Sequence, residues 1–389
     1  MTEIATFTGF VYPNETIISW GVLIVIYPYL TGLVAGAFTV SSFYHVFGMQ
    51  QFKPVARLAL LTSLSVMLFV PTPLLLHLGH PERSYLSMVT PHLTSAFAMF
   101  GFFAAFYTIL LILEVWFVFR ADNVARAQYS TGLARTFYRA VTLWSDDVSP
   151  RARLIDSKWL LTLAIVGIPS AHGLHGYIGF VYGSLKARQW WESDLMPIIF
   201  LFSAIVSGIA LLMVLYVVTC KLRRVRIDHA CLRGLTLALW GFLMFTVVLE
   251  GLEFANLVYK GKEGVDMIML YVQGPLFWRY FVLQFGMGAL LPVFIMGIMI
   301  AVNLRGRAFV IGATMSALLV LMNVLLMRWN VVIGGQEISK TGKGLLTYLM
   351  PFFGHESFVS ASILMIAPFV LLWILVRLFP PWVDRPGDR

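Results

Sequence analysis

Residues 196–218 read MPIIFLFSAIVSGIALLMVLYVV, and residues 281–302 read FVLQFGMGALLPVFIMGIMIAV. Neither stretch holds a charged residue, and each exceeds the roughly 20 residues that an α-helix needs to cross a bilayer. Every backbone N–H in hydrocarbon must find its partner within the spanning structure, so such runs are helices or barrel strands. They lack period-two alternation and are too long for barrel strands. The two stretches therefore predict transmembrane helices.

The composition extends this prediction to the whole chain. Hydrophobic residues make up 59% of the 389 residues and charged residues 12%, whereas soluble domains average about 45–50% and about 25%. We expect an all-α polytopic membrane protein, in which 1–389 is a single integral membrane domain with about nine transmembrane helices. The expected spans lie near residues 17–45, 55–78, 93–119, 159–183, 196–219, 232–258, 276–303, 308–334 and 358–378.

The basic residues predict the orientation, because Lys and Arg concentrate in cytoplasmic loops. One set of connections, including the inner basic loop 121–157 and the C-terminal segment 379–389, carries most of them. The other set, including the N-terminal segment 1–16 and the outer loop 335–357, carries few. We therefore expect the N-terminus outside and the C-terminus inside, which requires an odd number of spans. Residues 1–16 lack the basic n-region of a signal peptide, so the first span is expected to be retained.

The formal net charge of +9 is spread over these loops. That distribution fits contact with membrane lipid and argues against nucleic acid as a partner. Within 121–157, Phe137, Tyr138 and Trp144 occur among arginines such as Arg135 and Arg139. This mixture is typical of a helix lying in the membrane interface, but plain cytoplasmic anchoring explains it equally.

The chain has two cysteines, Cys220 and Cys231. An iron–sulfur cluster takes four thiolates, so we expect this chain to hold none by itself. The sequence contains no C-x-x-C-H motif for covalent haem and no phosphate-binding loop. From these motifs we expect no iron–sulfur cluster, no covalently bound haem or other cofactor, and no metal site in this chain.

Polar and ionisable side chains inside a membrane are costly, so each is a functional hypothesis. Glu114 lies toward the inner side of its span, whereas the others lie toward the outer side. Residues three apart share a helix face, so the two members of each acidic and each histidine pair lie together. A buried ion pair of an acidic residue with Arg328 is the ordinary alternative to a function. The outer group is Glu250, Glu253, Gln284, Arg328, His172, His175 and His77.

A quinone fits such a group near one membrane surface. Its ring needs a flat apolar slot, and its oxygens need donors that titrate near neutral pH, as histidine does. A buried carboxylate can relay the proton. A transporter is less consistent with the sequence, because no internal repeat and no midplane site is evident. The remaining histidines are expected to be solvated: His45, His80, His92, His229 and His355.

Several segments resemble the NrfD/PsrC family, the membrane subunits of polysulfide reductases. Their order and spacing carry the resemblance more than any one motif does. Within the family the chain is most similar to the DsrP type, a subunit of sulfite-reductase-linked complexes. The segments are Trp20-Gly21, IYPYLTGLVAG at 26–36, LGHPER at 78–83, Thr94-Ser95, 171–183, Trp190-Trp191, 195–208 and RWNVVIGGQ at 328–336.

The resemblance implies a core of two four-helix bundles in a prokaryotic cytoplasmic membrane. It implies a subunit that holds no cofactor and is not catalytic alone. The subunit would exchange electrons between quinone or menaquinone and an outer, periplasmic iron–sulfur protein of the ferredoxin type. Further redox subunits would be those of a Dsr-type or molybdoenzyme-type complex.

The resemblance also assigns candidate residues. The quinone-binding candidates are Trp20, Tyr27, His77, Arg83, Ser95, His172 and His175. Candidates for a proton path or a buried ion pair are Glu250, Glu253 and Arg328, to which their position in the spans adds Gln284 and Glu114.

Three other functions stay open on the sequence alone. A haem-b membrane anchor would use His77 with His172 or His175 as axial ligands. An ion- or proton-conducting module would show flux without a redox partner. A passive anchor for an outer enzyme would leave the polar group without a role.

Overall fold

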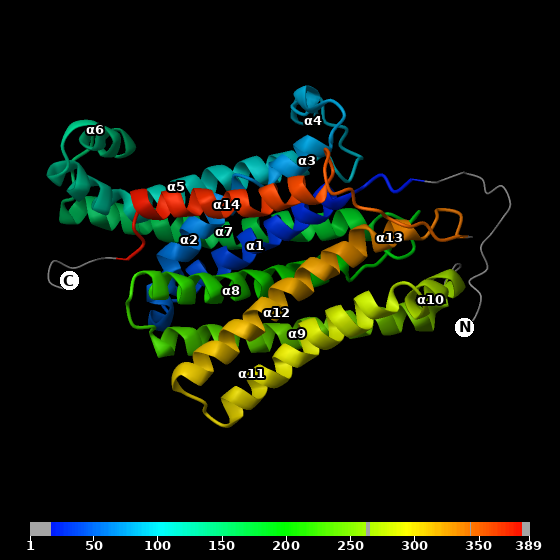
Figure 1. The fold of residues 1–389 in the computed structure, drawn as a ribbon. Helices are drawn as coiled ribbons and strands as arrows, with labels where there is room; N and C mark the ends of the chain where they lie inside the picture. The colour runs from blue at the N-terminus through cyan, green and yellow to red at the C-terminus, as the bar shows by residue number, and fades with distance from the viewer. Residues whose placement is uncertain (1–16, 262–264, 343, 383–389) are drawn as a thin grey trace.

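The computed structural model describes residues 17–261, 265–342 and 344–382, and most of them lie in helices (Figure 1). Across those ranges nine helical segments are long and apolar enough to cross a membrane. The same residues form no strand beyond an isolated bridge between Ile338 and Leu345. The predicted all-α polytopic fold is confirmed. The expected segment 1–16 and residues 383–389 lie outside the described residues.

The helices follow one another with short connections, and η3 is a π-helix that continues directly into α11. The bounds are α1 Val22–His45, η1 Gln50–Phe52, α2 Lys53–Met67, α3 Pro71–His77, η2 Pro81–Arg83, α4 Leu86–Val89, α5 Phe100–Tyr129, α6 Gly132–Val141, α7 Pro150–Gly183, α8 Met196–Leu222, α9 His229–Lys260, α10 Val265–Gln273, η3 Trp278–Leu290, α11 Leu291–Ala301, α12 Gly306–Val332, α13 Gly334–Glu337 and α14 Phe358–Leu378.

The helices form the two expected four-helix bundles. Helices α1, α2, α5 and α7 pack on one another in the first bundle, and α8, α9, η3–α11 and α12 do so in the second. Helix α1 is central, because it also packs on α8 and α12 and nearly all of its apolar stretch is buried. The ninth spanning helix, α14, packs outside the first bundle against α2 and α1.

The two bundles meet closely where α1 crosses α8. A methyl group added to Gly36 would lie only 2.7 Å from the Cα atom of Gly208. Small residues allow helix backbones to approach in membranes, where packing rather than hydrophobicity drives association. Glycine at both positions therefore sets the distance between the bundles.

The second and third expected spans differ from the structure. Helix α2 ends at Met67 and α3 begins at Pro71, so the span expected at 55–78 is broken. Proline lacks an N–H and suits the first turn of a new helix better than a helix interior. The helix expected at 93–119 begins at Phe100 and continues to Tyr129.

The inner loop expected at 121–157 is largely helical, which corrects the sequence prediction. Helices α5 and α7 extend into its two ends and α6 lies between them, and ion pairs join α5 to α7 and to α2. Arg120 lies 2.6 Å from Asp156, and Arg57 lies 2.6 Å from Asp122. Arg120 is buried, so buried charge is not confined to the half of the bundle where the sequence placed it.

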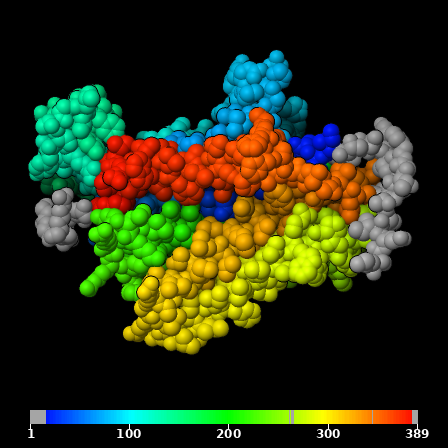
Figure 2. Space-filling model, in the orientation of Figure 1, coloured from blue at the N-terminus to red at the C-terminus, as the bar shows by residue number. Residues whose placement is uncertain are grey.

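Helix α6 confirms a helix within this basic segment. Tyr138 donates a hydrogen bond to the carbonyl oxygen of Leu378 (3.0 Å), and Phe137 packs near Phe379. Trp144 lies beyond the helix and is exposed. Figure 2 shows α6 standing off one end of the bundle, while the segment around α4 projects from its side.

The two ends of the bundle are named here for use below. The basic end is where α1, α8 and α14 finish and α2, α9 and α12 begin; it lies at the left of Figure 1. The opposite end, at the right, carries the starts of α1 and α8, together with α10 and α13.

Candidate functional site

A buried arginine organises the interior between the two bundles. The side chain of Arg328, on α12, is fully buried. Its Nη2 atom donates to the hydroxyl of Ser203 (2.5 Å) and lies 2.9 Å from Nε2 of His175. Its guanidinium lies 3.9 Å from the centre of the Phe200 ring. A cation over an aromatic face is attracted by the ring quadrupole, so this arginine cluster joins α7, α8 and α12.

The hydrogen bonds of the two histidines on α7 define their chemistry. Arginine has no acceptor, so Nε2 of His175 accepts from Arg328 and carries no hydrogen. His172 uses Nδ1 toward the carbonyl of Ile168 (2.8 Å) and Nε2 toward the hydroxyl of Thr39 (3.2 Å). His175 is fully buried and His172 is half-buried. Both residues are therefore held by partners within the protein.

A small pocket lies next to the arginine cluster, among α8, α9, η3 and α12. Its volume is about 70 Å³. The side chain of Gln284 donates to Glu250 (3.0 Å) and accepts from Asn330 (2.8 Å). Glu253 also lines the pocket, and its buried Oε2 atom has no hydrogen-bond partner among the described residues. Such a space suits a few ordered waters on a polar chain.

The predicted ion pair with Arg328 does not form. No carboxylate of a described residue lies within 4.0 Å of its guanidinium, and Glu250 bonds instead to Gln284. Met327 and Asn330 line the pocket, whereas Arg328 points to the cluster. Neighbouring residues of α12 therefore face two different polar groups, the pocket at Glu250 and the arginine cluster. The sequence analysis had treated these as one group.

A histidine–carboxylate pair lies at the opposite end. Nδ1 of His77, on α3, is 2.5 Å from Oε1 of Glu356, and both side chains are partly exposed. Its Nε2 has no hydrogen-bond partner among the described residues. A methyl group on Gly21 would overlap the Glu356 carboxylate, so the pair abuts the start of α1. Tyr348 accepts a hydrogen bond from the N–H of Val22 (3.0 Å) there.

Aromatic residues surround the start of α1 beside this pair. The Trp20 ring stacks on Trp191, with centroids 5.3 Å apart, and meets Tyr182 edge-on. The side-chain amide of Gln336 bonds both to the N–H and to the carbonyl of Trp20 (3.0 and 2.9 Å). Seven residues further along the chain, Tyr27 is buried and packs edge-on against Phe100. Trp20 therefore lies beside the pair through its neighbour Gly21, and Tyr27 lies deeper along the same helix.

Three of the predicted site residues lie elsewhere. Arg83 is exposed in η2, where its nearest charged partner is Glu82 at 3.9 Å. Ser95 is exposed and accepts a hydrogen bond from the N–H of Phe97. Glu114 is buried on α5, apart from the other acidic residues, and its Oε2 has no partner among the described residues.

Four of the five remaining histidines are exposed, as expected: His80, His92, His229 and His355. His45 is the exception. It is half-buried at the end of α1, and its Nε2 atom is buried without a hydrogen-bond partner among the described residues.

The sequence prediction missed a second polar group at the opposite end. Nη2 of Arg279 lies 2.5 Å from Glu337 and 2.9 Å from the hydroxyl of Tyr271, which itself donates to Glu337. Burial raises the pKa of Tyr271 above its usual value, so the phenol stays protonated as a donor. Glu337 and Glu356 both lie in the stretch expected to be an outer loop. Two acids in a semi-apolar connection were the signal that this loop folds back onto the bundle.

Metal-ligand geometry is not evident in the part of the chain that the structure describes. No group of three or more His, Cys, Asp or Glu side chains is close enough there to hold a metal ion. Cys220 and Cys231 are free and buried, and they lie near the basic end.

The chain is similar in sequence to membrane and other subunits of known redox enzymes. It is 32% identical to a selenate reductase subunit of Mesobacillus selenatarsenatis over 81% of this chain and 73% of that protein. It is 28% identical to a putative dimethyl sulfoxide reductase membrane subunit of Halobacterium salinarum, over 76% and 65%. It is 22% identical to an Hdr-like menaquinol oxidoreductase integral membrane subunit of Archaeoglobus fulgidus, over 72% and 62%. The chain thus spans less than two thirds of the latter two proteins.

The family model described as "Polysulphide reductase, NrfD" matches residues 12–339. This range includes the start of α1, the broken α2–α3 segment, the arginine cluster and Glu337. The chain is a multi-pass membrane protein that belongs to the NrfD polysulphide reductase family.

Proposed function

We propose that this chain is the quinone-reactive membrane subunit of a respiratory redox complex. It exchanges electrons between the quinone pool, menaquinone above all, and an iron–sulfur partner docked at the opposite end. The basic end then faces the cytoplasm, in accord with the positive-inside rule. Two cysteines are too few to hold a cluster, so the partner supplies the one-electron centres.

The relatives support the general part of this proposal. Their names describe subunits of a selenate reductase, a dimethyl sulfoxide reductase and a menaquinol oxidoreductase. The terminal substrates differ, whereas a membrane subunit of a redox complex is common to them. We therefore assign the quinone chemistry to this chain and the terminal substrate to its partners.

The observation that carries the proposal is the pairing of His77 with Glu356. The carboxylate fixes the imidazole through Nδ1 and leaves Nε2 directed away from that bond, for a quinone oxygen. At Nε2 the ring can take up a proton from quinol as the quinol is oxidised. Trp20 and Tyr27 supply aromatic surface for the quinone ring nearby.

The interior groups have a different role in this proposal. His172 and His175 are engaged on the protein side, so we assign them to holding the bundles together rather than to binding quinone. The chain Glu250–Gln284–Asn330 lines a pocket large enough for water and is a candidate proton relay. Both ring nitrogens of His172 are engaged, which disfavours it as a haem ligand, because a haem ligand needs a free ring nitrogen.

The test is electron transfer from a menaquinol analogue to the iron–sulfur clusters of the purified complex. Replacing His77→Ala is expected to slow cluster reduction on the order of 100-fold, the usual contribution of a positioned acid–base group. His80→Ala is the matched control, because His80 forms a similar but exposed pair with Glu82 at 3.0 Å. That variant is expected to behave like the unchanged protein.

Two further measurements make the result decisive. Elution of the whole complex from a sizing column checks that each variant still assembles. His77→Gln retains a donor but does not titrate, so it is expected to bind quinone and to transfer electrons slowly. Normal rates in an assembled His77→Ala complex would rule out this assignment.

A further inference from the structure

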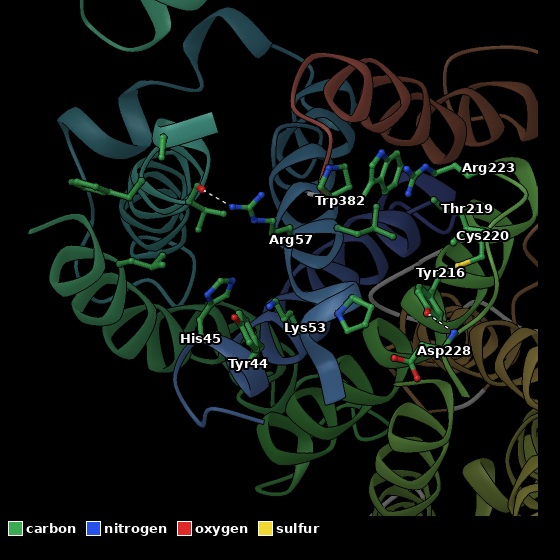
Figure 3. A pocket seen from close by; sticks show the side chains of 18 of the residues that line it. Tyr44, His45, Lys53, Arg57, Tyr216, Thr219, Cys220, Arg223, Asp228 and Trp382 are labelled. Atoms are coloured by element: carbon green, nitrogen blue, oxygen red, sulfur yellow. Dashed lines mark hydrogen bonds between the residues drawn. The ribbon is translucent and has the colours of Figure 1, made fainter. Parts of the chain in front are cut away.

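A large cavity lies at the basic end, far from the groups assigned above. Its volume is about 740 Å³. It lies where the end of α1, the start of α2, the facing turns of α5 and α7, and the end of α8 come together. Figure 3 shows Lys53 and Arg57 near its centre, with Arg223 and Trp382 on one side and Tyr44 and His45 on another.

Positive charge dominates the walls of this cavity. Five lining residues are Lys or Arg, and two are Asp. Both acids are already engaged, because Asp156 pairs with Arg120 at 2.6 Å and Asp228 accepts from the first backbone N–H groups of α9. The five basic residues are Lys53, Arg57, Arg153, Arg223 and Arg226.

Three of these cations form no ion pair within the described ranges. Arg57 pairs with Asp122, but no hydrogen bond or ion pair joins the side chains of Lys53, Arg153 or Arg226 to another described residue. They come from three different elements, namely α2, α7 and the connection between α8 and α9. His45 adds a ring nitrogen without a described hydrogen-bond partner at the same wall. The cavity therefore presents donors that await an acceptor.

The remaining walls are apolar and aromatic. The guanidinium of Arg223 lies 3.7 Å from the centre of the Trp382 ring. Pro54, Leu58 and Phe117 line other parts of the cavity. A cavity with cations on some walls and apolar surface on others matches a molecule that has an anionic head and apolar chains.

We propose that this cavity binds a phosphate group, carried by the headgroup of an anionic phospholipid or by a free phosphate compound. Lys and Arg side chains are the usual partners of phosphate oxygens, Arg as a planar fork and Lys as a point charge. Basic pockets between transmembrane helices at the cytoplasmic side bind such headgroups. The site is independent of the quinone assignment, because it lies at the other end of the bundle.

Native mass spectrometry of the purified protein in detergent tests the proposal. The probes are phosphatidylglycerol, phosphatidylethanolamine and inorganic phosphate, each added in a titration. The cavity variant is Lys53→Gln with Arg153→Gln and Arg226→Gln. The control variant removes the same charge from exposed sites at the same end, with Arg135→Gln, Arg305→Gln and Arg307→Gln.

The unchanged protein is expected to retain phosphatidylglycerol in preference to phosphatidylethanolamine. The cavity variant is expected to bind it on the order of 100-fold more weakly, since each cation near a lipid surface contributes about fivefold. The control variant is expected to lose little. Competition by inorganic phosphate at equal concentration would assign the site to a free phosphate compound, and its failure would assign the site to a lipid.

Equal losses in both variants would overturn the proposal, because general attraction to the basic end would then explain the binding. A lack of preference for phosphatidylglycerol, with no binding of inorganic phosphate, would overturn it as well. Thermal unfolding of both variants, without added lipid, checks that any loss does not arise from misfolding.

Discussion

The two ends of the bundle differ in how their charges are satisfied. At the opposite end His77 meets Glu356, and Arg279 meets Glu337 and Tyr271, each within hydrogen-bond distance. At the basic end three cations line a cavity of about 740 Å³ without an ion-pair partner among the described residues. At one end the charges are therefore paired internally, as the proposed quinone chemistry requires, and at the other end cations are left for the proposed phosphate group.

This difference follows from physical chemistry at each end. A group that takes up protons must be held in one orientation, which a neighbouring carboxylate provides for histidine. Cations that face an anionic membrane surface need no internal partner, because the surface potential of the cytoplasmic leaflet attracts them. Charge pairing, more than charge count, therefore distinguishes the two ends.

The largest effect is expected from breaking the contact that holds the two bundles together. Gly36→Leu would force a side chain into the backbone of α8 at Gly208. Overpacking a tight contact costs about 1–3 kcal/mol, and more where backbone meets backbone. We expect loss of the assembled complex, measured by sizing-column yield after extraction.

Gly173→Leu is the control for that change. Nothing lies within 4 Å of a methyl group built on Gly173, which is exposed on α7. Its yield is expected to match the unchanged protein. An equal loss of yield in both variants would show that assembly does not depend on the close contact where α1 crosses α8.

An intermediate effect on stability is expected when one cation is removed at the opposite end, and a smaller one when a cation is removed at the basic end. Arg279→Ala leaves the buried carboxylate of Glu337 without its charge partner, which costs about 1–3 kcal/mol. Arg226→Ala leaves no group unsatisfied, and surface changes of that kind stay within about 0.5 kcal/mol. Thermal unfolding in detergent measures both. Similar losses would contradict the contrast between the two ends.

The smallest effect concerns alkaline pH at the opposite end. Burial raises the pKa of Tyr271 above its usual value of 10.0, so the folded state favours the neutral phenol. The contribution of Tyr271 to the free energy of unfolding is complete below pH 10. It is lost as the pH rises above 10, and the free energy of unfolding falls by no more than about 1.4 kcal/mol per pH unit. Tyr271→Phe cannot ionise and should lose stability less steeply there. Tyr85→Phe removes an exposed phenol and should lose stability with pH as the unchanged protein does. If Tyr271→Phe also behaves like the unchanged protein, the burial of Tyr271 does not contribute to stability at alkaline pH.

The architecture could be predicted well from the sequence, because hydropathy and helix length directly reflect the bilayer. Nine spanning segments within the described ranges, two four-helix bundles and membership of the NrfD family are confirmed. The bend between α2 and α3 was missed, although Pro71 and Pro73 mark it. The narrower likeness to the DsrP type stays a prediction.

The site was predicted less completely, because contacts between distant segments leave no local pattern. Nothing in the order of residues indicates that Arg328 bonds Ser203 and His175 rather than Glu250. Glu356 lies 279 positions from its partner His77. The residue types and their depth in the predicted spans limited the number of candidate site residues. Only the fold showed which of these candidates contact one another.

Photolabelling with an azidoquinone most directly tests the central claim, that quinone binds beside His77. The purified complex would be labelled, digested and mapped by mass spectrometry, with excess menaquinol analogue as competitor. We predict competed label on peptides from the start of α1, around Trp20 and Tyr27, and from α3. Competed label confined to the pocket at Glu250 or to the cavity at the basic end would contradict the account.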